Sequence, residues 1–226
     1  MPLLMIDLDN TLLDRDAAFR AAAEAFLADH ALPATDLAWL TTLDASGYTP
    51  REEVARAMIE RYGEYVEYSG YDGYDAEGLA PAVHALLDGG AAERVTLSDA
   101  TGDALREAVS AGWTCVIVSN GRVAQQETKI RRTGLDRLVH GWVISEAVGH
   151  KKPAPEIFHA AADSVGASLR GAWMIGDSAH ADVLGASGVG ARSVWVSGGR
   201  SWTEAEYRPT GIAPDTATAV RQLLIG

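Results

Sequence analysis

Five short apolar segments, each followed directly by polar residues, limit what this chain can fold into. The segments cover residues 3–6, 115–118, 142–144, 172–175 and 193–196. Short apolar strands rich in Val and Ile, separated by helical stretches, are typical of a parallel sheet with helices on both faces. The helical stretches predicted between them cover residues 103–111, 123–132 and 155–164. We therefore expect an α/β fold whose core is a parallel sheet.

The first apolar segment ends in two acidic residues, Asp7 and Asp9, with one residue between them. In extended backbone, residues i and i+2 point the same way, so both carboxylates can face one site. Two carboxylates at close range repel each other, and a divalent cation that prefers oxygen ligands, such as Mg²⁺, relieves the repulsion. Asp is also common in turns, so the pair alone also fits a turn or a helix cap.

The ends of three further segments carry polar residues that complete a phosphoryl-transfer site in outline. These residues, in chain order, are Ser119, Lys152, Asp177 and Asp182. Ligands of open parallel sheets bind at the carboxyl ends of the strands, so these groups are expected at one edge. Carboxylates can hold a metal ion, and a hydroxyl together with an ammonium can hold an anion. Lys151, directly before Lys152, is the alternative source of the ammonium.

Charge and cysteine content exclude several other kinds of protein. The chain has 226 residues and a formal net charge of −12, and so acidic a surface disfavours binding to nucleic acids or anionic membranes. Cys115 is the only cysteine, so neither an internal disulfide nor a cysteine-based zinc cage can form. The first residues lack a signal-peptide pattern, and no apolar run is long enough to cross a bilayer. We expect a cytoplasmic protein without nucleic-acid or membrane partners.

The interval 15–95 interrupts the alternation of strands and helices. Residues 16–30 place Phe19, Ala22, Ala23, Phe26 and Leu27 on one helical face. Further helical patterns cover residues 51–62 and 79–87, with Pro50 and Pro81 placed like helix starts. The sequence thus predicts two domains, a core formed by residues 1–14 and 96–226 and an inserted helical cap formed by residues 15–95.

Weaker signals have ordinary structural interpretations. Tyrosines recur at positions 62, 65, 68, 71 and 74; they could stack on a substrate, but packing between helices is the favoured interpretation. His180 is expected in a solvent-facing loop, since carboxylates suit a hard cation better than imidazole does. Cys115 is expected to fill core space. The Gly- and Pro-containing segment 197–214 is predicted to be a surface loop.

Four stretches resemble the motifs of the haloacid dehalogenase-like superfamily, in the family's order and at its usual spacing. They are DLDNT at 7–11, SNG at 119–121, KPAPEIF at 152–158 and GDSAHADVLGA at 176–186. The resemblance covers nearly everything outside residues 15–95, and that insertion resembles the family's helical C1 cap. It implies a Rossmann-like core with the helical cap closing over the strand edge. Where the family often has glycine, this chain has Asn10, which also tolerates unusual backbone angles.

By this resemblance, Asp7 is the nucleophile that attacks phosphorus and becomes an aspartyl-phosphate. Asp9 protonates the leaving oxygen and then takes a proton from the hydrolysing water. Ser119 and Lys152 hold the phosphoryl oxygens, Lys152 in preference to Lys151 because it directly precedes the proline.

The resemblance also implies a Mg²⁺ site and further phosphate contacts. The implied metal ligands are Asp7, Asp9 (through its backbone carbonyl), Asp177 and, as an outer or secondary ligand, Asp182. The implied phosphate-binding residues are Thr11, Asn120 and Gly121.

The resulting expectation is Mg²⁺-dependent hydrolysis of a small soluble phosphomonoester by a monomer or homodimer. A carboxylate at Asp9 favours phosphate-ester chemistry over halide displacement, because an alkoxide leaving group needs a proton and a halide does not. The alternatives are a phosphotransferase or mutase of a sugar phosphate, a 2-haloacid dehalogenase, and a non-catalytic binding protein. The physiological substrate is left open, because residues of the cap determine it.

Overall fold

The structure, a computed structural model, describes residues 1–69 and 76–225. The chain divides into two compact units. The core unit contains Met1–Asp14 and Thr96–Gly226, and the helical unit contains Arg15–Val95. Each unit is described by itself below.

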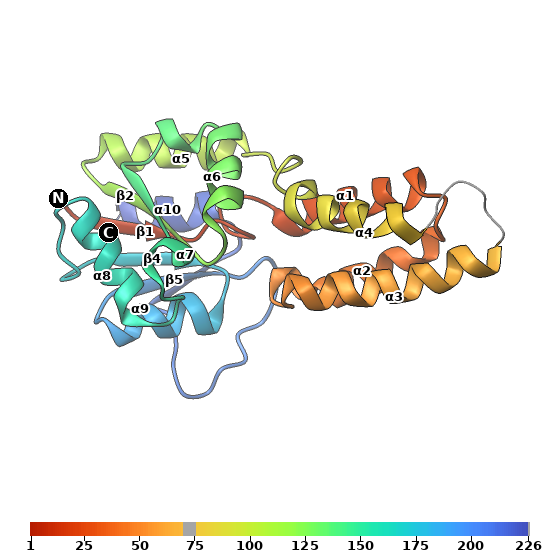
Figure 1. Cartoon of the computed structure of the whole chain (residues 1–226). Coiled ribbons are helices and arrows are strands. Elements are labelled where there is room, and N and C mark those ends of the chain that lie inside the picture. The colour runs from red at the N-terminus through yellow and green to blue at the C-terminus, as the bar shows by residue number, and fades with distance from the viewer. Residues whose placement is uncertain (70–75, 226) are drawn as a thin grey trace. The chain divides into compact units, whose positions relative to one another are not determined.

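The described part of the core unit is built on one sheet of six parallel strands (Figure 1). The strands are β1 (Leu3–Ile6), β2 (Thr114–Ser119), β3 (Gly141–Ile144), β4 (Trp173–Gly176), β5 (Arg192–Val196) and β6 (Gly211–Ala213). Their order is β3-β2-β1-β4-β5-β6, so β1 lies between β2 and β4. Ile6 at the end of β1 is level with Ile117 and Ile175, and the residues that follow the three strands therefore reach the same edge.

Helices cover both faces of this sheet (Figure 1). On one face lie α5 (Asp99–Ser110) and α10 (Thr216–Ile225), and on the other α8 (Pro155–Ser164) and α9 (Gly185–Gly188). The remaining helical elements of this unit are α6 (Val123–Arg132), α7 (Ser145–Val148), η4 (Leu135–Arg137) and η5 (Ala179–Leu184). Helix α5 begins where the Ser98 side chain accepts a hydrogen bond from the Thr101 N–H, a typical N-cap. The predicted α/β fold with a Rossmann-like core is confirmed.

The core lies on both faces of the sheet, as a central parallel strand requires. Leu3 and Met5 of β1 pack with Phe158 of α8 in one cluster, and the alternation of a strand directs Leu4 and Ile6 to the opposite face. All four residues of β1 are buried. Cys115 is buried as predicted, and burial raises the pKa of its thiol to about 12.

One part of the predicted surface loop 197–214 is a strand. Residues Gly211–Ala213 form β6, which pairs in parallel with β5 through the register Val194 to Gly211. Beyond β5, the Ser197 N–H donates to the carbonyl of Ala213 at 2.8 Å. The prediction failed here because three residues beginning with glycine carry no period-2 pattern, and pairing with β5 alone gives them strand geometry.

In its described residues, 15–69 and 76–95, the helical unit has four longer helices and several short helical turns. They are α1 (Arg15–Asp29), η1 (Ala34–Asp36), α2 (Leu37–Asp44), η2 (Ala45–Gly47), α3 (Arg51–Ser69), α4 (Ala76–Ala85) and η3 (Leu86–Gly90). All five residues of the predicted apolar face of α1 are buried. Pro50 directly precedes α3, as predicted. Pro81 lies inside α4 rather than at its start, because the helix already begins at Ala76.

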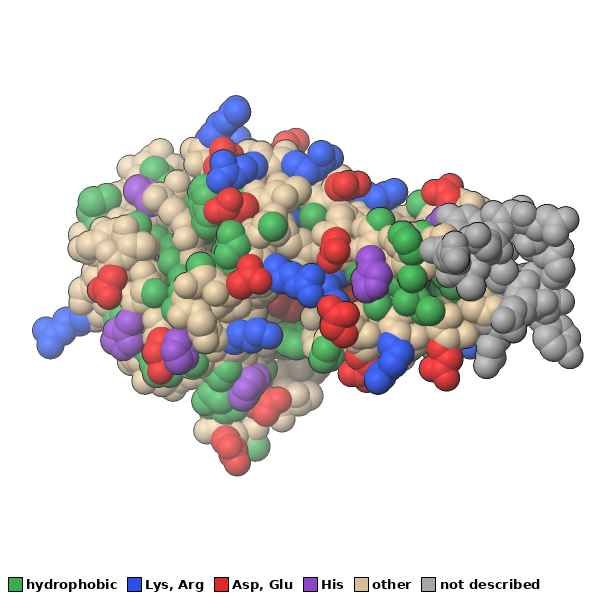
Figure 2. Space-filling view, in the orientation of Figure 1, with side chains coloured by type: hydrophobic (Ala, Val, Ile, Leu, Met, Phe, Trp, Pro, Cys, Tyr) green, Lys and Arg blue, Asp and Glu red, His purple; other side chains and the backbone are tan. Residues whose placement is uncertain are grey.

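The tyrosine series is described only in part. Tyr62 is buried, and its ring lies 5.9 Å from that of Trp39 and 6.3 Å from that of Phe26, which is helix packing as predicted. Tyr71 and Tyr74 lie outside the described residues. Within residues 1–69 and 76–225, none of the helices has the length and apolar character needed to cross a membrane. On the face that Figure 2 shows, acidic and basic side chains are interspersed.

Candidate active site

Three carboxylates meet at the carboxyl edge of the sheet. Asp7 follows β1, Asp177 follows β4, and Asp182 comes from η5. One carboxylate oxygen from each lies within 4.8 Å of the others. The Asp7 N–H still donates to the carbonyl of Ile175 at 2.9 Å, so pairing of β1 with β4 fixes where Asp7 leaves the sheet. The strand order thus joins groups that are 170 and more positions apart in the sequence.

Asp182 reaches this cluster through a gap that only glycine leaves open. A Cβ at Gly176 would lie 2.1 Å from Asp182 Oδ2, so any larger residue at the end of β4 would displace the carboxylate. The same oxygen accepts a hydrogen bond from the Ser178 N–H at 3.0 Å. Asp182 is only 1% exposed. The turn after β4 therefore fixes the position of the Asp182 carboxylate in the cluster.

Lys152 is the buried cation of the cluster. Its Nζ lies 2.6 Å from Asp7 Oδ1, 2.7 Å from Asp182 Oδ1 and 2.6 Å from the carbonyl of Val118. The contacts with Asp7 and with the Val118 carbonyl are hydrogen bonds, and the contact with Asp182 is an ion pair. Lys152 is buried, whereas Lys151 is exposed. Of the two adjacent lysines, Lys152 is the one at the site.

Burial and the neighbouring charges shift the pKa values of Asp7, Asp177 and Lys152. Burial raises the pKa of Asp7 to about 8; Lys152 opposes the rise, and Asp182 and Asp177 add to it. Burial also raises the pKa of Asp177 to about 6, reinforced by Asp182 and opposed by Arg200. Burial acts to lower the pKa of Lys152, but Asp182 and Asp7 together raise it above its ordinary value. Three clustered carboxylates around one buried ammonium therefore leave excess negative charge, which a divalent cation would neutralise.

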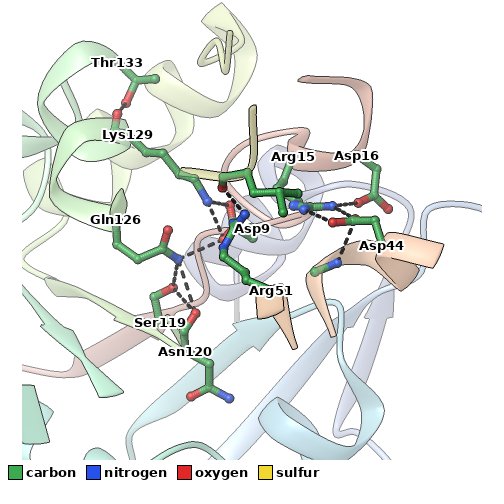
Figure 3. A network of polar contacts seen from close by, with 12 residues as sticks. Asp9, Arg15, Asp16, Asp44, Arg51, Ser119, Asn120, Gln126, Lys129 and Thr133 are labelled. Atoms are coloured by element: carbon green, nitrogen blue, oxygen red, sulfur yellow. Dashed lines mark hydrogen bonds and ion pairs between the residues drawn. The ribbon is translucent and has the colours of Figure 1, made fainter. Parts of the chain in front are cut away.

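The Asp9 side chain points toward Lys129 and Gln126 of α6 (Figure 3). Among the described residues, the carboxylate cluster consists of Asp7, Asp177 and Asp182, and both Asp9 oxygens lie 2.7 Å from Lys129 Nζ instead. The i, i+2 argument failed because β1 ends at Ile6 and the chain turns, with Asn10 in the left-handed region at φ 59°. The predicted ligation by the Asp9 backbone carbonyl stays a prediction.

The other predicted site residues lie around this edge and have protein partners. Ser119 ends β2, is 1% exposed, and its Oγ accepts from Gln126 Nε2 at 2.6 Å. The Asn120 amide donates to the Lys152 carbonyl at 3.0 Å and accepts from the Lys152 N–H at 2.8 Å. It therefore fixes the loop that carries the buried lysine.

Thr11 and Gly121 support the backbone in a similar way. Thr11 Oγ1 accepts from the Asp177 N–H at 3.0 Å, and the Gly121 N–H donates to Ser145 Oγ at 3.0 Å. The phosphate-binding roles assigned to Thr11, Asn120 and Gly121 stay predictions. His180 is exposed, as expected, although it lies in η5 rather than in a loop.

Two residues of α6 that contact the predicted site residues Asp9 and Ser119 were not themselves predicted. Gln126 and Lys129 are 1% and 3% exposed, although the helix 123–132 is polar almost throughout. One signal could have identified Gln126: Ile130 is the buried apolar residue of α6, and Gln126 precedes it by four positions, on the same helical face. The polar face of this helix is thus partly directed into the protein.

Two further unpredicted residues hold the loop after β4. Trp195 Nε1 donates to the Asp177 carbonyl at 2.8 Å, and Arg200 donates to the same carbonyl at 3.0 Å and to Asp177 Oδ2 at 3.2 Å. The Arg200 guanidinium also lies over the Trp195 ring, 5.4 Å from its centre. Asp177 is therefore held from the side of β5 and the loop that follows it.

This arrangement, with four motifs converging on one edge of a parallel sheet, agrees with a comparison against protein families. The family model described as haloacid dehalogenase-like hydrolase matches residues 1–190. The chain belongs to this family. The resemblance predicted from the four motifs is thereby confirmed.

Relatives within this hydrolase family match parts of the chain. A glyceraldehyde 3-phosphate phosphatase of Pyrococcus abyssi is 36% identical over 89 residues, 39% of this chain and 37% of that protein. The pyrimidine 5′-nucleotidase YjjG of Escherichia coli K12 is 35% identical over 109 residues, 47% of this chain and 46% of that protein. The chain thus matches less than half the length of each of these curated relatives.

Solved structures of the family share the fold over the whole chain. YfnB of Bacillus subtilis, whose crystal structure was determined bound to magnesium, superposes with a TM-score of 0.70 at 24% identity. The superposition covers 99% of this chain and 97% of that one. At this identity the likeness establishes the family fold, with its core and its inserted helices, and nothing finer.

Proposed function

We propose that this member of the hydrolase family is a Mg²⁺-dependent phosphatase that cleaves a small phosphomonoester through an aspartyl-phosphate at Asp7. The observation that carries the proposal is the group of Asp7, Asp177 and Asp182 around the buried Lys152. Excess carboxylate, an ammonium and a nearby hydroxyl are what phosphoryl transfer requires. The names of the two curated relatives, a phosphatase and a nucleotidase, support the same chemistry.

The residues present fit Mg²⁺. The donor set is made of carboxylate oxygens, the ligands that this hard cation prefers, and one oxygen each of Asp7, Asp177 and Asp182 lies within 4.8 Å of the others. Asp7 and Asp177 would hold the ion with the Asp9 carbonyl, and Asp182 would support it. When bound, the ion neutralises charge on the phosphoryl oxygens.

In the first half of the reaction, an oxygen of Asp7 attacks phosphorus and forms a P–O bond while the ester P–O bond breaks. Lys152 fixes the direction of the Asp7 carboxylate through its contact with Oδ1. The leaving alkoxide takes a proton from Asp9 and departs as the free alcohol. Ser119, at the end of the neighbouring strand, donates to a phosphoryl oxygen.

In the second half, water attacks the phosphorus of the aspartyl-phosphate. Asp9 accepts a proton from that water, the bond between phosphorus and the Asp7 oxygen breaks, and inorganic phosphate leaves. Asp7 returns to its carboxylate form and Asp9 to its acid form. The need for a proton on the leaving group is the reason to favour phosphate esters over halides, whose departure requires none.

The test is a phosphatase screen over sugar phosphates, nucleotides and phosphoglycolate, with and without Mg²⁺. We expect phosphate release that needs Mg²⁺ and disappears in Asp7→Asn, a substitution that keeps the size of the side chain and removes the nucleophile. Asp36→Asn, an equally conservative change in the helical unit, serves as the matched control and should keep activity. Activity retained by Asp7→Asn would contradict the assigned nucleophile.

The intermediate can be trapped independently. Rapid acid quench followed by borohydride reduction should convert an acyl phosphate at Asp7 into homoserine, which peptide mass spectrometry locates. Transfer of the phosphoryl group to a sugar without free phosphate would replace the hydrolase by a phosphotransferase or mutase. Release of halide from 2-haloacids would favour a dehalogenase. No turnover of either kind of substrate would favour a non-catalytic binding protein.

A further inference from the structure

Two buried polar side chains of α6 contact members of the proposed site from outside the four motifs (Figure 3). Lys129 Nζ lies 2.7 Å from each Asp9 oxygen, and Gln126 Nε2 lies 2.8 Å from Asp9 Oδ2. Gln126 also donates to Ser119 Oγ at 2.6 Å. Helix α6 thus contacts both Asp9, the proposed proton donor, and the hydroxyl of Ser119 at the end of β2.

The ion pair between Lys129 and Asp9 lies largely out of solvent on the lysine side. The Lys129 side chain is 4% exposed and that of Asp9 25%. Lysine is almost never fully buried unless it is paired, because an ammonium without a partner loses its hydration. The Asp9 carboxylate offsets part of that loss, and the contact of the ammonium with both of its oxygens limits rotation of the carboxylate.

Gln126 determines which way the Ser119 hydroxyl can donate. Because the amide donates to Ser119 Oγ, the hydroxyl hydrogen is left for another acceptor. The acceptor at hand is the Asn120 carbonyl at 3.5 Å, which is long for an O–H···O hydrogen bond. Gly121 makes room for this amide: its φ is +154°, and a Cβ there would lie 3.1 Å from Gln126 Cγ and Cδ.

We propose that Lys129 and Gln126 are positioning residues, which hold the Asp9 carboxylate and the Ser119 hydroxyl in the orientation that the leaving group and the phosphoryl oxygens require. This inference rests on the proposed function and adds to it two residues that the four motifs do not contain. Neither residue needs to touch the substrate, since each acts through the side chain it holds.

The test compares esters whose leaving groups differ in their need for a proton. An alkyl phosphate needs the proton from Asp9, whereas p-nitrophenyl phosphate has a leaving group stable enough to depart without one. The quantity compared is kcat/KM with Mg²⁺, because it reports the steps up to departure of the leaving group and excludes hydrolysis of the aspartyl-phosphate. The alkyl ester is the one that the phosphatase screen shows to react fastest.

We expect Lys129→Met to lower kcat/KM for the alkyl ester by about 10- to 100-fold, part of the 100-fold or more that general acid catalysis contributes. The value for p-nitrophenyl phosphate should fall by less than about threefold, and Lys129→Arg should restore most of the alkyl value. Arg131→Met, a change of an exposed cation on the same helix, is the matched control and should alter neither. An equal loss for both esters would overturn the proposal, because it would indicate a merely structural role.

A double-mutant cycle with Asp9→Asn provides a second measurement. If Lys129 acts through Asp9, the effect of Lys129→Met should shrink to less than about twofold in the Asp9→Asn background. An undiminished effect there would overturn the proposal.

The Gln126 part of the proposal is tested with Gln126→Leu. This substitution should raise KM and the inhibition constant of inorganic phosphate severalfold, because Ser119 loses its partner. Unchanged phosphate affinity would contradict the positioning role of Gln126. Wild-type protein that hydrolyses neither ester would instead contradict the proposed function itself.

Discussion

Both units bury charged side chains, but they balance those charges differently. In the helical unit, the buried Arg15 faces Asp44 with two hydrogen bonds, and Arg61 faces Asp36 with bonds of 2.7 and 2.8 Å. Each of these acids has a guanidinium partner within its own unit. In the core unit, three carboxylates gather around Lys152.

The pKa directions show what this difference means. The hydrogen bond from Arg61 lowers the pKa of Asp36, so the folded chain favours its ionised form. Burial raises the pKa of Asp7 and Asp177, so the folded chain penalises their ionised forms. A balanced pair contributes to packing, whereas an unbalanced cluster costs stability until a ligand arrives, and such a cost is typical of functional sites.

Removal of the buried cation should have the largest effect. We expect Lys152→Met to lower kcat by about 100- to 1,000-fold, because the charge that orients Asp7 is lost. The free energy of unfolding should fall by about 3–5 kcal/mol, because buried carboxylates are left unpaired. Lys151→Met, the exposed neighbour, is the matched control. Phosphate release and chemical denaturation measure the two effects, and equal effects of both variants would contradict the assignment of Lys152.

Mg²⁺ should stabilise the core unit specifically. At a concentration 100 times its dissociation constant, a bound ion adds about 2.7 kcal/mol to the free energy of unfolding. Hydrogen exchange should show slower amides after β1 and β4, with little change in residues 15–69 and 76–95. Asp177→Asn should lose this response and Asp36→Asn should keep it. Stabilisation of Asp177→Asn by Mg²⁺ would place the ion elsewhere.

The pH dependence of stability without metal should separate the two kinds of acid. The folded pKa of Asp177 is raised from 3.8 to about 6, so between these values the folded chain binds more protons than the unfolded chain. Stability therefore falls as pH rises through this window. In EDTA, the free energy of unfolding of Asp177→Asn should rise by about 1–2 kcal/mol relative to that of wild type between about pH 4 and about pH 7. A difference that does not change with pH would contradict the raised pKa.

The smallest change in stability is expected for Asp36 in the helical unit. Its dependence on pH has the opposite sign to that of Asp177. Asp36 has a lowered pKa, so its contribution is present above the unfolded pKa and is lost as pH falls through the folded pKa. Asp36→Asn should therefore lower the free energy of unfolding by about 1 kcal/mol at neutral pH. This value is modest because Arg61 is about half exposed. The cost should vanish in acid, and kcat should not change. A large loss of activity would mean that this pair serves the reaction.

Much of the fold could be predicted because its signals are local. The strands β1 to β5 are short and mostly apolar, and the buried, two-sided environment of a parallel sheet favours that composition. Asp7, Ser119 and Asp177 could be assigned to one edge because Asp7 and Ser119 directly follow an apolar run and Asp177 follows one after a single glycine. The strand β6 was missed because its three residues have no pattern of their own.

The direction of side chains beyond the strands was less predictable. Asp9 was expected to point with Asp7, but the chain turns after Ile6 and the Asp9 carboxylate meets Lys129, 120 positions later. Arg200 holds Asp177 from the segment that was predicted to be a surface loop, and Trp195 holds it from the neighbouring strand β5. These contacts join residues whose neighbours in sequence give no sign of the partner.

The sequence by itself determined the family, the parallel sheet and the acidic residues at its strand ends, because strand periodicity and motif spacing are properties of contiguous residues. Only the tertiary structure decided that the Asp9 side chain stays outside the carboxylate cluster of the described residues, and that Gln126 and Lys129 lie buried beside the site. The physical reason is that burial and pairing of a charge depend on what strand order and helix packing bring near it, and chain positions more than 100 residues apart carry no local record of that proximity.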